Sequence, residues 1–331
     1  MRLPYPALLA ALGLAGALLF LASLLVGPAA IGLSDSLAAL IHGQGEAVTL
    51  VMREVRLPRA ILGAAIGAAL GLSGALLQGL LRNPLAEPGL IGTSSSAALG
   101  AVLAIQTGVS AAFALALPLA ALAGALASVA VLLLLSGPRG STLTLILAGI
   151  GISSLATATT ALILNLSPNP FAANEIIFWM MGSLADRSML HVQLALPFLG
   201  LGAVLAVPAA RSLDALTLGE DAAASMGVNL RRLRLLTVLA AALMVGAATA
   251  VAGAVGFVGL VVPHLLRRAC DARPSRLLAA SALGGAAVVL AADVAVRLIA
   301  PDRDLKLGVL TAIVGAPFFL HLIVRTRREG L

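Results

Sequence analysis

Charged and aromatic side chains are scarce in this sequence of 331 residues: Asp, Glu, Lys and Arg make up 11% of it, and Phe, Trp and Tyr 3%. The only lysine is Lys306, and because Leu307 follows it, the chain lacks the Gly-x-x-x-x-Gly-Lys-Ser/Thr loop that binds nucleotide phosphates. If ATP drives this protein, another chain binds the ATP and its Mg²⁺. The only cysteine, Cys270, excludes an internal disulfide bond and a metal site built from several cysteines.

The residue patterns of hydrolases and metalloenzymes are missing as well. The sequence has no Gly-x-Ser-x-Gly or His-Glu-x-x-His motif and no close pair of carboxylates within an apolar run. Its histidines are too dispersed for metal-ligand spacing; they are His42, His191, His264 and His321. We therefore expect no enzymatic activity, and no metal or other cofactor bound by this chain.

Apolar residues, in contrast, make up 60% of the chain and recur in runs of about 20 residues, the length that a helix needs to cross a bilayer. Because a backbone in lipid must satisfy its own hydrogen bonds, we predict an all-α, polytopic membrane protein with a single transmembrane domain over 1–331. About ten helices are predicted, at 6–26, 59–81, 89–108, 111–136, 142–164, 190–210, 233–252, 254–267, 277–300 and 307–324. The eighth is the weakest, since Gly256, Gly259 and Pro263 interrupt it, and a half-crossing is an alternative.

The basic residues predict the orientation of these helices. With the N-terminus in the cytoplasm, 14 of the 21 Lys and Arg residues fall in inside segments and 7 in outside segments, as the positive-inside rule requires. The C-terminus then also lies in the cytoplasm. The pI near 11.3 reflects this topology, and we expect no nucleic-acid partner. The first apolar run, 6–26, exceeds the roughly 7–15 residues of a signal peptide, which favours a retained helix over a cleaved signal.

Residues 82–89, Arg-Asn-Pro-Leu-Ala-Glu-Pro-Gly, are a compact polar interruption between two of these helices. Asn83 and Pro84 end one helix and Pro88 begins the next, because a residue before proline avoids the helical region. The pattern predicts a stiff turn at the cytoplasmic mouth, which is either a working part or a plain connector.

On the outside, residues 53–59 place Arg56 and Arg59 beside Pro58, a residue that suits the first turn of a helix. Rigid guanidinium groups bind carboxylates, so this segment is predicted to meet a docking partner or, alternatively, lipid head groups.

On the inside, the loop 211–232 predicts a short helix within 216–227, with acids at its start and Gly227 at its end. A helix of two turns is not stable alone. It is therefore expected to lie either in a cleft of a cytoplasmic motor or on its own bundle.

Glycine is frequent, with 34 residues. Gly63, Gly67, Gly71 and Gly74 share one face of the second predicted helix, which allows close contact between backbones. In residues 253–267, repeated glycines followed by Pro263 predict a helix that bends or breaks, as helices beside transport pathways do.

Six motifs, in order along nearly the whole chain, resemble the iron-chelate/haem/cobalamin permease family of type II ABC importers. They are RLPR at 56–59, RNPLAEPG at 82–89, WMMGS at 179–183, LTLGEDAAASMG at 216–227, GAVGFVGLVVPHLLR at 253–267 and GVLTAIVGAPFF at 308–319. The sequence departs from the family at 304–308, where Lys306 stands in place of a proline, which weakens the prediction of where the last helix begins.

The resemblance implies a homodimer of ten-helix permease subunits in the bacterial inner membrane, with two cytoplasmic ABC ATPases and a periplasmic binding protein. The implied ATPase-coupling residues are Leu216, Leu218, Gly219, Glu220, Ala223, Met226 and Gly227. The implied docking residues for the binding protein are Arg56, Arg59 and Arg297. The implied cytoplasmic gate comprises Asn83, Leu85, Thr142 and Leu143, of which Leu143 replaces a serine in the cobalamin importer.

The main alternative is a proton-coupled secondary transporter that uses Asp293, because an acid within a transmembrane helix is a candidate functional group. Arg297 lies four residues later on the same helical face, so a structural ion pair also accounts for Asp293. A membrane scaffold without transport activity is a further alternative. Within the permease family, the substrate remains open among ferric siderophore, haem and cobalamin.

Overall fold

The computed structural model describes residues 3–29, 31–43, 45–137, 142–300 and 305–328, and all regular structure in these ranges is helical. Each of the ten predicted segments contains a helix. These helices are α1 (Tyr5–Leu25), α4 (Leu57–Leu80), α5 (Thr93–Gln106), α6 (Ala116–Ser136), α7 (Thr142–Leu166), α9 (Met189–Ala206), α12 (Leu230–Ala252), α13 (Val258–Arg267), α14 (Pro274–Ile299) and α15 (Leu307–Arg328).

Seven helices in the described part of the chain are long and apolar enough to cross a membrane, so the predicted count of ten crossings is not confirmed. The shortfall includes α5 and α13. The 14 residues of α5 span about 21 Å, less than the roughly 30 Å of a hydrocarbon core, and α13 has 10 residues. α5 is shorter than the predicted helix 89–108 because residues 88–91 form a separate 3₁₀ turn, η2. α13 is shorter than the predicted helix 254–267 because residues 253–256 are not helical.

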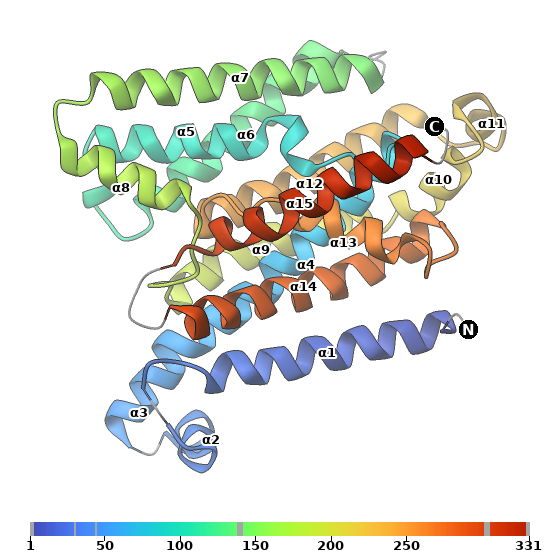
Figure 1. The fold of residues 1–331 in the computed structure, drawn as a ribbon. Coiled ribbons are helices and arrows are strands. Elements are labelled where there is room, and N and C mark those ends of the chain that lie inside the picture. The colour runs from blue at the N-terminus through green and yellow to red at the C-terminus, as the bar shows by residue number, and fades with distance from the viewer. Residues whose placement is uncertain (1–2, 30, 44, 138–141, 301–304, 329–331) are drawn as a thin grey trace.

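Shorter helices occupy the two ends of the bundle (Figure 1). One end carries α10 (Ala209–Leu216) and α11 (Glu220–Ser225), together with the first turn of α1 and the last described turns of α15. The opposite end carries α2 (Leu33–His42), α3 (Glu46–Leu50) and α8 (Pro170–Met180). We call these the α11 end and the α8 end. The start of α1 and the last described turns of α15 therefore lie on the side of the predicted coupling loop, and which side of a membrane this is remains a prediction.

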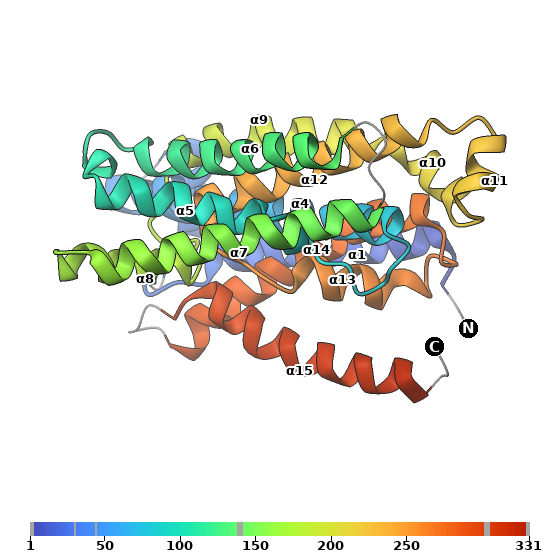
Figure 2. The same ribbon diagram turned by 90° about the horizontal axis from the view of Figure 1, so that it is seen from above.

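The most deeply buried spans are α4 and α12, which form the centre of the bundle. α14 packs along α4, α12 contacts α4, α6 and α9, and α5 lies between α6 and α7. α1 covers α14 at one edge, and Figure 2 shows α15 running along an outer face. The core is built mainly from alanine, leucine and valine, which allows helices to lie close together.

The glycines of α4 make the close helix contact that their spacing predicted. A Cβ atom on Gly67 would overlap the backbone carbonyl of Gly285 in α14, and one on Gly71 would overlap the carbonyl of Ser281. Gly74 faces α13 in the same way. Because α4 has no room for a side chain at Gly67 or Gly71, the backbones of α4 and α14 lie in van der Waals contact over about one turn.

Candidate functional site

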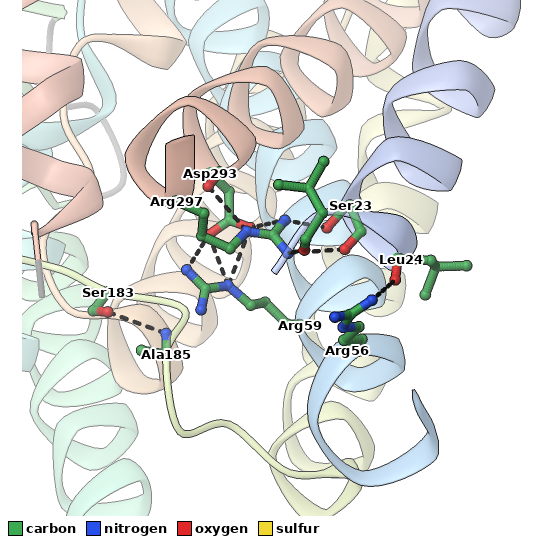
Figure 3. Close-up of polar contacts among 9 residues, drawn as sticks. Ser23, Leu24, Arg56, Arg59, Ser183, Ala185, Asp293 and Arg297 are labelled. Carbon is green, nitrogen blue, oxygen red and sulfur yellow. Dashed lines mark hydrogen bonds and ion pairs between the residues drawn. The ribbon is translucent and has the colours of Figure 1, made fainter. Parts of the chain in front are cut away.

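Three charged side chains from two helices meet at the α8 end (Figure 3). Asp293 of α14 is 1% exposed, and its carboxylate accepts hydrogen bonds from Arg59 of α4, from Nε at 3.0 Å and from Nη2 at 2.8 Å. Nη2 of Arg297 donates to the other carboxylate oxygen at 2.8 Å. The ion pair between Asp293 and Arg297, one of the two interpretations of this acid, is therefore present, and Arg59 makes it a group of three.

Arg297 of this group, together with the nearby Arg56, also holds the C-terminal end of α1, where backbone carbonyls have no partner within the helix. Nη1 of Arg297 donates to the carbonyls of Ser23 at 2.9 Å and Val26 at 2.6 Å. Nη1 of Arg56 donates to the carbonyl of Leu24 at 3.0 Å, as Figure 3 shows. Positive charge is favourable at this end of a helix. The group thus ties α1, α4 and α14 together.

The structure brings the three predicted docking arginines together but engages their guanidinium groups within the chain. The side chains of Arg59 and Arg297 are 17% and 8% exposed, and Arg56 is 4% exposed. The residues before Pro58 are also helical, since the π-helix η1 (Val51–Arg56) leads directly into α4. Pro58 lies in the first turn of α4, as predicted. Docking through these arginines remains a prediction.

The turn 82–89 follows the end of α4 at the α11 end. The carboxamide Oδ1 of Asn83 accepts a hydrogen bond from the backbone N–H of Leu85 at 2.9 Å, which closes the turn locally. The ring of Pro88 then packs on Gly259 of α13, where a Cβ atom would lie 2.7 Å from the ring. The turn therefore does more than connect α4 to α5, because it contacts a third helix.

Two polar side chains fasten α13 to this region. Oε1 of Glu87 accepts a hydrogen bond at 3.0 Å from the N–H of Phe257, the residue that precedes α13. Gln78 of α4 donates to the carbonyl of Leu260 at 3.2 Å and accepts from Arg267 at 2.8 Å. Sequence reasoning missed both contacts, which join residues more than 160 positions apart. Of the three predicted interruptions only Gly256 lies outside a helix, because α13 continues through Gly259 and Pro263. These contacts hold α13 at both of its ends.

The predicted gate residues lie on two elements. Asn83 and Leu85 are in the turn, whereas Leu143 is in the first turn of α7 and is 63% exposed. The side chain of Thr142 lies outside the described residues. The segment after the turn meets α7 at Gly92, where a Cβ atom would lie 2.8 Å from a methyl group of Ile152. A gate built from these four residues remains a prediction.

The predicted coupling loop forms two short helices, and the second, α11, lies within 216–227, where a short helix is predicted. The seven predicted coupling residues divide by burial. Leu216 and Ala223 are 3% and 0% exposed and pack into the core, whereas Leu218 and Met226 are 68% and 63% exposed. Gly219 and Gly227 flank α11 with positive φ angles. Glu220 pairs with Arg234 of α12 at 2.8 Å.

At the α8 end, glycines of three different motifs meet. A Cβ atom on Gly182, Gly253 or Gly308 would overlap a backbone carbonyl of a neighbouring segment. The N–H of Ser183 donates to the carbonyl of Ala252 at 2.7 Å, and the N–H of Gly308 donates to that of Gly182 at 3.3 Å. This backbone joint connects the ends of α8 and α12 to the start of α15. It also fixes the start of the last helix at Leu307, despite the missing proline.

Two cavities flank this joint. One of about 360 Å³ lies between α13, α14 and α15 and is lined by apolar residues such as Val261, Val288 and Val314. The other, of about 330 Å³, is lined by acidic, basic and aromatic side chains, among them Arg187 and Lys306. The ammonium of Lys306 lies 5.4 Å from the ring centre of a phenylalanine in α8, and burial lowers the pKa of Arg187. Neither cavity has the arrangement of ligands that would identify a chelate.

Comparison with known proteins agrees with these motifs. Residues 14–325 match the model of the FecCD transport family. The chain is 38% identical over 288 residues to the haemin transport system permease of Yersinia pestis, with 86% of each chain covered. It is 39% identical over 278 residues to an Fe(3+) dicitrate transport system permease of Escherichia coli, covering 84% of this chain and 86% of that one.

A cobalamin import permease of Halobacterium salinarum is 37% identical over 286 residues, covering 86% of this chain and 76% of that one. Among solved structures, an ABC transporter assigned to the metal-chelate type, in an inward-facing conformation, superposes with a TM-score of 0.86 and 31% identity. The alignment covers 97% of this chain and 99% of that chain.

Proposed function

Because the chain belongs to the FecCD transport family, we propose that it is the permease subunit of an ABC importer that carries an iron chelate, haem or cobalamin across the bacterial inner membrane. The subunit works as a homodimer with two cytoplasmic ATPases and a periplasmic binding protein. Both of its termini and its α11 end face the cytoplasm, and the binding protein docks at the α8 end near Arg56, Arg59 and Arg297.

The observation that carries this proposal is the form of the α10–α11 segment, which projects from one end of the bundle (Figure 1). Its inner face is anchored by Leu216 and Ala223, so it has a defined position. Its outer face presents two large apolar side chains, Leu218 and Met226. Such a surface suits contact with another protein, and the sequence lacks a nucleotide-binding loop of its own.

The transport activity is tested by purifying the chain with its candidate ATPase and binding protein and measuring uptake into proteoliposomes. Uptake that requires ATP and is blocked by vanadate is expected. Uptake driven by a pH gradient in the absence of ATP would overturn the proposal and favour the secondary transporter. The structure offers that alternative little support, since the carboxylate of Asp293 is held in ion pairs with both Arg59 and Arg297.

The ATPase contact is tested by placing a charge on the outer face of the segment. Leu218→Glu and Met226→Glu should abolish co-purification of the ATPase, because a buried, unpaired carboxylate opposes association. The matched control is Leu37→Glu, which places the same charge on an exposed leucine of α2 at the opposite end. Co-purification that survives both changes would remove the coupling role of this surface.

The substrate is best approached through the binding protein. The relatives named above are permeases for haemin, ferric dicitrate and cobalamin, so similarity alone spans three chemistries. Titrating the purified binding protein with a ferric siderophore, haem and cobalamin should give tight binding of one of them. Binding of none would refute the proposed substrate range.

A further inference from the structure

The first turn of α14 is capped by a side chain from the α10–α11 segment. Oδ1 of Asp214, in α10, accepts a hydrogen bond from the backbone N–H of Ser275 at 2.8 Å. Its Oδ2 accepts from the hydroxyl of the same serine at 2.6 Å. Ser275 is the second residue of α14, and Arg273, which precedes that helix, makes no side-chain cap. The cap that normally comes from the adjacent residue is therefore supplied from 61 positions earlier.

The position of Asp214 is unfavourable for α10 itself. It lies in the last turn of that helix, where a negative charge faces the negative end of the helix dipole. The same charge is favourable at the start of α14, where N–H groups have no partner within the helix. The carboxylate of Asp214 therefore stabilises the contact between α10 and α14 and not α10 itself.

The residue next to Asp214 fixes α10 to α4. Leu213 is fully buried, and its side chain lies over Gly79, where a Cβ atom would come within 3.3 Å of it. α10 thus contacts α4 through Leu213 and α14 through Asp214. Because α4 and α14 already touch backbone to backbone, these three helices form one tightly connected unit.

α11 also contacts α12. This contact includes the pair Glu220 and Arg234, whose side chains are 44% and 20% exposed. Ion pairs this accessible to solvent contribute little, about 0–1 kcal/mol. α14, in contrast, is 26 residues long, about 39 Å, and carries Asp293 and Arg297 near its other end. α14 thus joins the capped end to the Asp293 group through one continuous helix.

We propose that Asp214 is a positioning residue that passes movement of the α10–α11 segment into α14. The inference rests on the proposed function, because the movement is the one that the ATPase imposes on this segment. Without the cap, the segment still binds the ATPase, but α14 no longer follows it. Hydrolysis of ATP is then less tightly linked to movement of substrate.

The test uses the complete complex in proteoliposomes and measures substrate imported per ATP hydrolysed. Asp214→Ala should lower this ratio roughly fivefold. Loss of a helix cap shifts an equilibrium by about this factor, and the equilibrium here is between α14 joined to α10 and α14 detached from it. Ser275→Ala removes one of the two contacts and should give an intermediate ratio. Asp214→Asn should restore most of the ratio, because the amide oxygen still accepts from the N–H of Ser275 and the amide nitrogen can donate to its hydroxyl.

The control is Asp271→Asn, which removes an exposed carboxylate from the turn before α14 and leaves the cap intact. Its ratio should equal that of the wild type. A wild-type ratio in Asp214→Ala, or an equal fall in Asp271→Asn, would overturn the inference. If Asp214→Ala does not fold, Ser275→Ala carries the test, and an unchanged ratio in that variant overturns the inference as well. Absence of ATP-dependent uptake by the wild type would instead refute the proposed function.

Discussion

Replacing Asp293 by alanine should destabilise the protein by about 3–5 kcal/mol, the usual effect of removing one partner from a buried ion pair. This loss of stability follows from the contacts of Asp293, which accepts hydrogen bonds from both Arg59 and Arg297, whose side chains are 17% and 8% exposed. Arg297 keeps its bonds to the carbonyls of Ser23 and Val26. Arg59 loses its carboxylate partner, so most of the effect comes from Arg59.

The assay is thermal unfolding in detergent, followed by the fluorescence of Trp179, the only tryptophan. The control is Asp271→Asn, which breaks the ion pair with Arg276, whose members are 50% and 36% exposed. Asparagine tolerates the positive φ angle of this position, and an exposed pair contributes about 0–1 kcal/mol. The midpoint should fall several times further in Asp293→Ala than in the control. Equal shifts would refute the reasoning.

A triple variant separates the charge from the packing. Combining Asp293→Leu with Arg59→Met and Arg297→Met replaces the whole group by apolar side chains of similar size. Because all three charges of the group are removed together, none of them is left without its partner, and stability should recover to near that of the wild type. A triple variant as unstable as Asp293→Ala would mean that the helices at this end depend on the hydrogen bonds to α1 rather than on charge pairing.

Three further changes test other parts of the bundle. Gly71→Val should separate α4 from α14, because the new side chain overlaps the carbonyl of Ser281, and about 1–3 kcal/mol of stability or more should be lost. Undiminished recovery of folded protein by size-exclusion chromatography would contradict this packing. Glu87→Ala should lower the stability by about 1 kcal/mol, which is measured as a lower unfolding midpoint. Glu87→Gln should leave the midpoint unchanged, because glutamine retains an acceptor for the N–H of Phe257. Burial, and secondarily a neighbouring aspartate, raises the pKa of Cys270, so less thiolate is present at neutral pH. Maleimide should therefore label the native protein slowly and the SDS-unfolded protein fully. Rapid labelling of the native protein would contradict the burial of this thiol.

The helices could be predicted from the sequence because their signals are local. Apolar runs end at charges or prolines, and the spacing of Gly67 and Gly71 identified the face of α4 that contacts α14. The interruption before α13 was also visible as a cluster of glycines. The number of full crossings was not predictable in the same way, since apolar character extends through residues 88–91, where the backbone leaves the α-helix.

The polar contacts also differ in predictability according to how far apart their members are in the sequence. The pair of Asp293 and Arg297 was visible because its members are one helical turn apart. Arg59 is 234 positions from Asp293, and only the packing of α4 on α14 brings them together. The role of Asp214 was hidden for the same reason: within its own loop it is simply one acid among several, and its partner belongs to a helix that begins 60 residues later.

The contact between Glu87 and the N–H of Phe257 has a consequence for protein engineering and for evolution. The turn 82–89 and the segment 253–267 act as one part, because the first supplies the acceptor that the start of the second requires. A chimera that takes only one of these segments from a relative would combine a turn and a broken helix that had not been selected together. Exchanging both at once should be tolerated better, and in an alignment of relatives substitutions at the two segments should be correlated.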